Sequence, residues 1–216
     1  MASLTPVSLH APVPAAAARP GALALVRWWL CLLLCAAIVA GASHYFLGRP
    51  SGHFGDHYFL LLAHILGGSG ALLIGPWQFS RRLRHRHPSL HRWLGRIYLS
   101  SVALGSIAGF SLAIFSEEGW PTHVGFGLLA VFWFFTGWMA YRRILAGDVA
   151  AHRRWMIRNF SLSLAAVTLR LYPVPLLVLA HWSFPHAYIF VAWMCWVPNF
   201  LIAEWLVRHH STVAAI

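Results

Sequence analysis

Charge is scarce in this chain, and acidic charge is scarcer still. Only 10% of its 216 residues are charged, with five acids and no lysine, whereas 59% are hydrophobic. The mean hydropathy is +0.65. Because a soluble globular domain carries roughly a quarter charged residues, the composition argues against such a domain. It predicts an all-α integral membrane protein.

Cysteine and recognisable catalytic motifs are also scarce. The three cysteines, Cys31, Cys35 and Cys195, lie in apolar runs and predict no disulfide framework. No glycine-rich phosphate loop and no Ser or Cys nucleophile spaced from a base is present. Glu117 and Glu118 are neighbours in a predicted loop, so their side chains diverge. The sequence therefore offers no signal for hydrolytic chemistry.

Long apolar runs dominate what remains. A helix needs about 20 apolar residues to cross a bilayer, and six runs meet or approach that length: 23–47, 58–79, 93–115, 122–141, 155–180 and 186–207. We expect six transmembrane helices in an up-down bundle, with spans two to five as a four-helix core. The predicted organisation is a disordered cytoplasmic segment (1–22), a membrane domain (23–207) and a cytoplasmic tail (208–216). A retained first span is favoured over a cleaved signal peptide, because its polar lead and apolar run are both long.

The arginines predict the orientation of the spans. All 16 basic residues are arginine and the formal charge is +11; fourteen arginines gather beside alternate span ends, and Arg49 stands alone on the other side. The positive-inside rule then predicts a protein of the cytoplasmic (inner) membrane with both termini cytoplasmic. The basic run RRLRHRHPSLHRWLGR, residues 81–96, becomes an inner loop that meets anionic headgroups. No nucleic-acid partner is needed to explain it.

Four histidines lie in or at the start of the middle spans and alternate between the two sides. His64 and His123 fall toward the outer side, and His91 and His152 toward the inner side. Polar groups within spans suggest function by default. Two imidazoles from facing helices can hold a b-type haem by its two axial positions. The pattern therefore predicts one or two haems, ligated by His64 with His123 and by His91 with His152.

Small and basic residues extend this hypothesis. Gly68, Gly95 and Gly127 each follow one of these histidines by four residues, on the same helix face, and leave room for a flat macrocycle. Arg170 is expected about 27 Å along one helix face from His152, near an outer haem propionate. Arg153 or Arg158 would serve an inner propionate. The alternative is that small residues spaced by four only let helices pack closely, with the histidines as interfacial groups.

Several segments resemble a known family. HILGGSGALLIGPWQF, HPSLHRWLGRIYL, GFGLLAVFWFFTGWMAY and GDVAAHRRWMIRNFSLSLAAVTLRLY are similar to a bacterial family of predicted membrane proteins, domain of unknown function 2306. The resemblance covers about half of the chain and implies about six spans and no established activity. The histidine layout alone is similar to the transmembrane cytochrome b561 type. That similarity implies two haems between four helices, with the same pairing as above.

Two functional hypotheses remain. The first is a membrane electron carrier or oxidoreductase that holds haem b and takes electrons from a quinol or another redox carrier. The second is a cofactor-free membrane protein that binds or transports a small solute or lipid; only the fifth span, with Arg170 and two prolines, resembles a broken transporter helix. A copper or zinc site on the outer side is a further alternative. Its ligands would come from His44, His53, His57, His181, His186 and Asp56.

Overall fold

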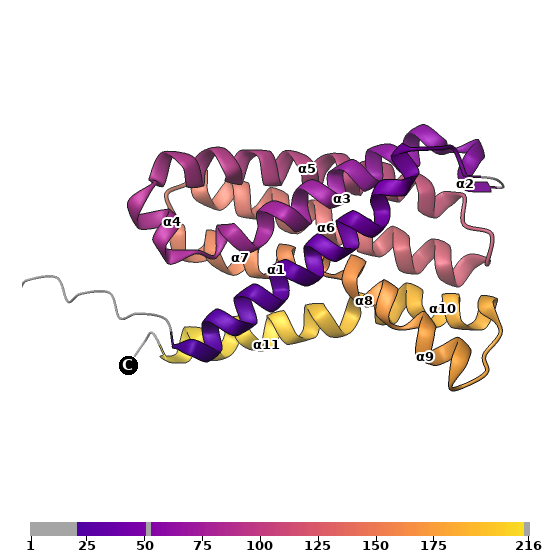
Figure 1. Ribbon diagram of the computed structural model, residues 1–216. Helices are drawn as coiled ribbons and strands as arrows, with labels where there is room; N and C mark the ends of the chain where they lie inside the picture. The colour runs from indigo at the N-terminus through magenta and orange to yellow at the C-terminus, as the bar shows by residue number, and fades with distance from the viewer. Residues whose placement is uncertain (1–20, 51–52, 214–216) are drawn as a thin grey trace, which may run out of the picture.

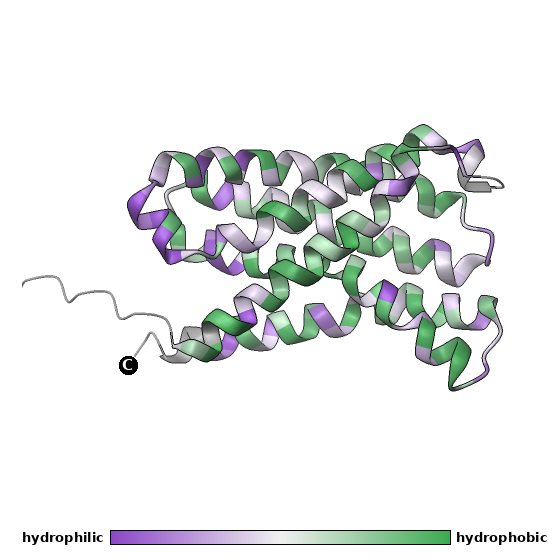
Figure 2. Ribbon diagram, in the orientation of Figure 1, coloured by the Kyte–Doolittle hydropathy of each residue, from purple (hydrophilic) through white to green (hydrophobic). Residues whose placement is uncertain are grey.

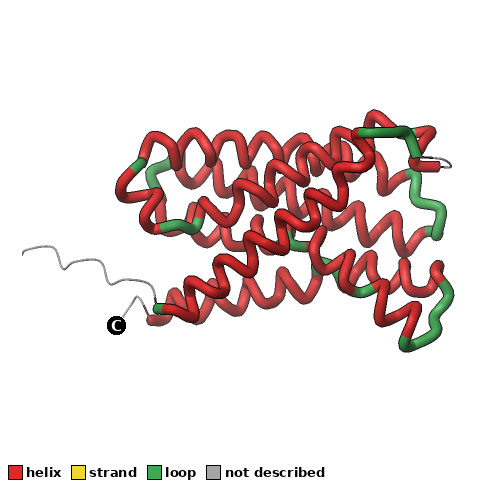
Figure 3. Tube along the Cα trace, viewed as in Figure 1, coloured by secondary structure: helices red, strands yellow, loops and turns green. Residues whose placement is uncertain are grey.

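The computed structural model describes residues 21–50 and 53–213, and within these ranges it contains helices and no strand (Figure 3). The elements are α1 (Ala22–Ala42), the 3-10 helix η1 (Ser43–Phe46), α2 (His53–Asp56), α3 (Tyr58–Gln78), α4 (Arg81–Arg86), α5 (Pro88–Ile114), α6 (Trp120–Leu145), α7 (Val149–Ser163), α8 (Ala165–Leu171), α9 (Pro173–Val178), α10 (Phe184–Met194) and α11 (Val197–Val213). The predicted disordered segment lies outside the described residues except for its last two. The predicted tail begins inside α11.

Among the residues that the structure describes, six helical spans are long and apolar enough to cross a membrane, as predicted. α5, α6 and α7 extend further than the predicted apolar runs at the end where α4 lies, whereas α3 ends one residue before the predicted position. α5 begins at Pro88, whose fixed φ and missing N–H suit the first turn of a helix. α6 continues to Leu145 because Arg142 and Arg143 in its last turn complement the helix dipole. Hydropathy marks the membrane-embedded part of a helix and not its ends.

The last two spans are interrupted. The fifth consists of α7, α8 and α9, and the break at Pro173 matches the predicted effect of the prolines. The sixth stops at Met194 and restarts at Val197, an interruption that the sequence analysis did not predict. Pro198 explains it, because proline has no N–H to donate and its ring clashes with the carbonyl four residues earlier.

The four-helix core forms from consecutive neighbours. α3 packs on α5, α5 on α6 and α6 on α7, and α7 contacts α3 to close the bundle. α3 and α6 therefore lie across the bundle from each other, as do α5 and α7. α1 crosses the outside of α3 and reaches α8, whereas α10 and α11 pack on α6 and α7 (Figure 1). The predicted up-down arrangement of spans two to five is thus present.

α3 and α5 approach until their backbones touch. A Cβ added at Gly67 would overlap the backbone of Gly105 and the carbonyl oxygen of Ser101. A Cβ added at Gly105 would come within 2.9 Å of the Trp133 ring. These two glycines are needed because their missing side chains allow the close approach. The small-residue packing alternative therefore applies to this contact.

A polar network ties three core helices together. Tyr98 Oη on α5 donates to Asn159 Oδ1 on α7 at 2.7 Å. Asn159 Nδ2 donates to the carbonyl oxygen of Trp133 at 2.7 Å and to Thr136 Oγ1 at 2.9 Å, both on α6. Trp133 Nε1 donates to Ser163 Oγ at 2.9 Å. Since these side chains are buried, the network satisfies polar groups that the bilayer could not.

One end of the molecule is rich in arginine. Figure 2 shows hydrophilic residues gathered at α4 and the adjoining ends of the core helices. The start of α1 and the end of α11 lie toward the same end (Figure 1). We call this the arginine-rich end. The even number of spans brings the two ends of the described chain to one side.

Candidate functional site

The imidazole of His64, a residue of α3, packs against α5. Its Nδ1 lies 2.8 Å from the carbonyl oxygen of Gly105, and a Cβ added at Gly109 would come within 2.8 Å of the same nitrogen. Because a carbonyl oxygen only accepts, Nδ1 carries the hydrogen and Nε2 keeps its lone pair. The charge of Arg170 acts on this ring, and its guanidinium donates to the carbonyl oxygen of Ala166 at 2.9 Å. Its role at an outer haem propionate stays a prediction.

His123 is also held by α5. Its Nδ1 donates to the carbonyl oxygen of Ala113 at 2.7 Å. The ring borders a groove of about 440 Å³ between α5 and α6, lined mainly by apolar side chains that include Phe110 and Trp120. The Trp120 ring stands edge-on to the imidazole at 5.7 Å between centroids. His123 thus supplies a polar group to an otherwise apolar groove.

The structure does not bring His64 and His123 together. The carbonyls that hold them are eight residues apart on α5, or about 12 Å along the helix axis. Two axial ligands of one iron must face each other across the metal. In this conformation the two rings lie at different depths on the same neighbouring helix.

The positions of His91 and His152 suit two ligands of one metal better than the positions of His64 and His123 do. Each lies one turn inside its helix, α5 or α7, and both helices begin at the arginine-rich end. The two histidines therefore lie at the same end of the bundle. His152 Nδ1 donates to the carbonyl oxygen of Ala140 on α6 at 2.8 Å, which leaves Nε2 available. His91 faces protein, since its Nδ1 is buried, and that nitrogen has no hydrogen-bond partner.

The Gln78 side chain lies beside Gly95, one turn after His91. Its side chain is only 6% exposed, and its Nε2 lacks a hydrogen-bond partner. A Cβ added at Gly95, one turn after His91, would lie 3.2 Å from Gln78 Oε1. Gln78 was not predicted; a lone amide near the end of an apolar span was the available signal. We call Gln78, Arg84, His91, His152 and Arg153 the Gln78 cluster.

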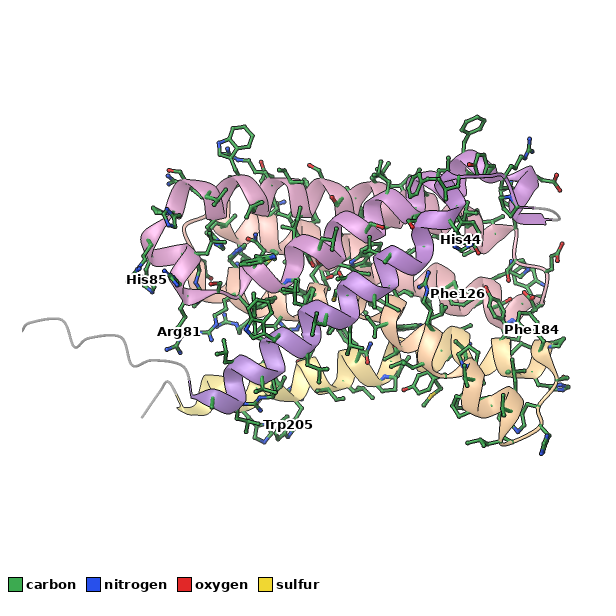
Figure 4. All side chains as sticks on the ribbon, in the orientation of Figure 1. His44, Arg81, His85, Phe126, Phe184 and Trp205 are labelled. Atoms are coloured by element: carbon green, nitrogen blue, oxygen red, sulfur yellow. The ribbon has the colours of Figure 1, made fainter. Side chains whose placement is uncertain are left out.

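The Gln78 cluster is positively charged. Partial burial, and then the charges of Arg153 and Arg81, lower the pKa of the Arg84 guanidinium. Arg84 also acts on His91. Arg81 and His85 of α4 point away from the bundle at this end (Figure 4). Several cationic side chains therefore lie close together on one side of the Gln78 cluster, whereas Arg81 and His85 of α4 point outward.

The three predicted glycines have different surroundings. Nothing lies within 4 Å of a Cβ added at Gly68, and only Phe110, at 3.9 Å, approaches one added at Gly127. These two positions therefore border open space, whereas Gly95 is covered by Gln78. The tight helix contact involves Gly67 instead.

The arginines that were predicted to bind haem propionates also have different surroundings. Arg158 forms a two-point ion pair with Glu204 on α11, with N–O distances of 2.7 and 3.1 Å. It is thus engaged in holding α11, so of the two arginines considered for an inner propionate only Arg153 lies at the Gln78 cluster. The single straight helix assumed between His152 and Arg170 is wrong, because α7 ends at Ser163 and α8 begins at Ala165.

The proposed copper or zinc ligands do not converge. Among the residues that the structure describes, no group of three or more His, Cys, Asp or Glu side chains could hold a metal ion. His44 Nδ1 instead bonds the Gly41 carbonyl, and His186 Nδ1 bonds Ser183. The side chain of His53 lies outside the described residues.

The imidazole side chain is the feature that the four core positions have in common. Three of the four core histidines have Nδ1 fixed by a carbonyl of a neighbouring helix. Such a bond fixes the tautomer and orients Nε2 toward a metal or a proton. The arrangement at the arginine-rich end can therefore hold a ligand between α5 and α7, with cationic side chains beside it.

Comparison with known proteins assigns the family. No curated protein and no solved structure matches the chain. Residues 61–207 match the family described as "Predicted membrane protein (DUF2306)", and this segment carries the four core histidines and the Gln78 cluster. The likeness of the histidine layout to cytochrome b561 stays a prediction. Because the match spans more than half of the sequence, the protein belongs to the DUF2306 family of predicted membrane proteins.

Proposed function

We propose that this multi-pass membrane protein holds b-type haem and transfers electrons, with His91 and His152 as the first ligand pair. The observation that carries the proposal is the pair of imidazoles one turn inside α5 and α7, at the same end of helices that lie across the bundle. Bound haem would supply one-electron chemistry whose potential the surrounding protein sets.

The chain's own residues have defined tasks in this proposal. The Ala140 carbonyl holds Nδ1–H of His152 and so aims Nε2 into the bundle. Arg153 lies at the same end and is suited to a propionate by its planar donors.

A second haem at His64 and His123, with Arg170 at its propionate, is the outer part of the proposal. It requires both rings to leave the α5 carbonyls and meet at one depth. The open space beside Gly68 and Gly127 supports this part. The number of haems per chain separates a one-haem protein from a two-haem protein.

The test is spectroscopic. Protein expressed with haem precursor and purified in detergent is expected to show a Soret band and a sharp α-band on dithionite reduction. His91→Ala and His152→Ala should each abolish the inner haem, whereas His85→Ala, an exposed histidine at the same end, should retain it. His64→Ala should remove about half of the haem if two are bound and none if one is bound.

Circular dichroism and gel filtration would verify that each variant folds. Folded wild-type protein without a Soret band would refute haem binding. That result would leave the second function, a cofactor-free protein that binds a small solute or lipid. The apolar groove beside His123 supports this function, and in the haem proposal the same groove supports a lipid-soluble carrier such as a quinol.

The orientation is part of the proposal. The gathering of arginines at one end supports placing that end, with both termini, in the cytoplasm of a cell whose inner membrane holds the protein. A fluorescent protein fused after the C-terminus should then be bright, and alkaline phosphatase fused there should be inactive. Active phosphatase at this position would reverse the orientation.

A further inference from the structure

Two buried nitrogens at the arginine-rich end have no partner. Gln78 Nε2 on α3 and His91 Nδ1 on α5 are both buried and make no hydrogen bond. A buried donor without a partner destabilises the folded state, and the hydrocarbon part of a bilayer offers no water to replace that partner. The Gln78 amide nitrogen only donates. His91 Nδ1 donates in the tautomer that leaves Nε2 with its lone pair, the tautomer of the other three core histidines. A buried amide donor and this imidazole beside the same glycine indicate a bound group that accepts hydrogen bonds.

The positive charges near these two nitrogens indicate that the bound group is negatively charged. Arg153 and Arg81 both act electrostatically on Arg84, and Arg84 also acts on His91. Within the described chain, nearby acids are engaged elsewhere. Asp148 caps α7 by accepting from the Ala151 N–H at 2.8 Å, and Glu204 pairs with Arg158 and Arg208. Capping leaves Asp148 its negative charge, but the arginines around Arg84 outnumber it. A cluster with excess positive charge and a buried donor favours an anion.

Depth narrows the choice of anion. The Gln78 cluster lies one turn inside α5 and α7 and next to α4, where the apolar spans give way to arginines. Headgroup phosphates occupy this zone of a bilayer, and free phosphate reaches it from the aqueous side. Phosphate oxygens accept strong hydrogen bonds from guanidinium and amide donors.

We propose that the Gln78 cluster is a phosphate-binding site, with Gln78 Nε2 and His91 Nδ1 as buried donors and Arg84 and Arg153 as the charge. The phosphate is either that of an anionic lipid headgroup or free in solution. The site does not depend on haem, because it uses Nδ1 of His91 whereas a haem iron would use Nε2. Absence of haem would therefore leave it unchanged.

Thermal unfolding of the detergent-purified full chain tests the site. Inorganic phosphate at millimolar concentration should raise the Tm of the wild type in one arm. In the other arm, nanodiscs of phosphatidylglycerol should raise it above nanodiscs of phosphatidylcholine. A response to phosphate identifies the free anion, and a response only to phosphatidylglycerol identifies the headgroup. No response in either arm overturns the proposal and leaves only water on the two nitrogens.

Two variants and one control locate the site. Gln78→Met keeps the side chain's length without the unpaired amide, so it should fold at least as stably in the absence of ligand. It and Arg84→Gln should each weaken binding by about tenfold, the loss expected for one charge-assisted hydrogen bond. Arg82→Gln removes an exposed charge from the same helix α4 and should change binding by less than about twofold. Equal loss in all three variants would reduce the site to general surface charge and refute it.

Discussion

Gly67→Ala is expected to lower the free energy of unfolding by about 3 kcal/mol, the upper part of the range for overpacked cores. The added Cβ would overlap backbone atoms of Gly105, and backbone, unlike a flexible side chain, cannot turn aside. α3 and α5 would have to separate along their most extensive contact. Chemical or thermal unfolding followed by tryptophan fluorescence in detergent would measure the loss.

Gly68→Ala is the matched control for this prediction. It lies next in the same helix, and nothing is within 4 Å of its added Cβ. Both variants gain the same helix propensity, about 1 kcal/mol in favour of alanine. The difference between them therefore measures packing alone. Equal stability of the two variants would show that α3 and α5 do not touch through Gly67.

The sequence predicted the spans more reliably than the faces of the helices. Apolar length was sufficient for six spans, because the bilayer imposes that length directly. Which glycine of HILGGSG contacts α5 depends on the rotation of α3, and hydropathy carries little of that information in a helix that is apolar all round. Gly68 was chosen for its spacing from His64, whereas the close contact belongs to Gly67. Distinguishing neighbours that differ by about 100° of rotation required the structure.

Only part of the candidate site could be predicted from the sequence, because the rest depends on residues that are distant in the chain. The four histidines were visible because ionisable residues are rare in spans. Gln78 and Asn159 each stand alone in apolar sequence, and their meaning depends on distant partners. Asn159 meets Tyr98 across 61 residues of sequence, and Gln78 matters because its amide nitrogen has no partner. Neither property can be read from a local pattern.

Asn159→Ala is expected to lower the free energy of unfolding by about 2–3 kcal/mol. One interhelical hydrogen bond in a membrane protein averages only about 0.6 kcal/mol, because the unfolded chain in the membrane also finds partners. Asn159, however, bonds Tyr98, Thr136 and the Trp133 carbonyl at once. Its loss leaves several buried groups with one hydrogen-bond partner fewer and opens a small cavity between three helices. The same unfolding assay would measure it.

A double-mutant cycle with Tyr98→Phe tests whether the network is responsible. Tyr98→Phe alone should cost about 1 kcal/mol, because it removes one donor and leaves Asn159 its bonds to α6. If the Tyr98–Asn159 bond carries part of the loss, the double variant should be less destabilised than the sum of the single variants by about 0.6–1 kcal/mol. Ser111→Ala, which removes only an exposed intrahelical bond to Ile107, should be nearly neutral and additive with both. Additivity of Tyr98→Phe and Asn159→Ala would mean that the two residues stabilise the bundle independently.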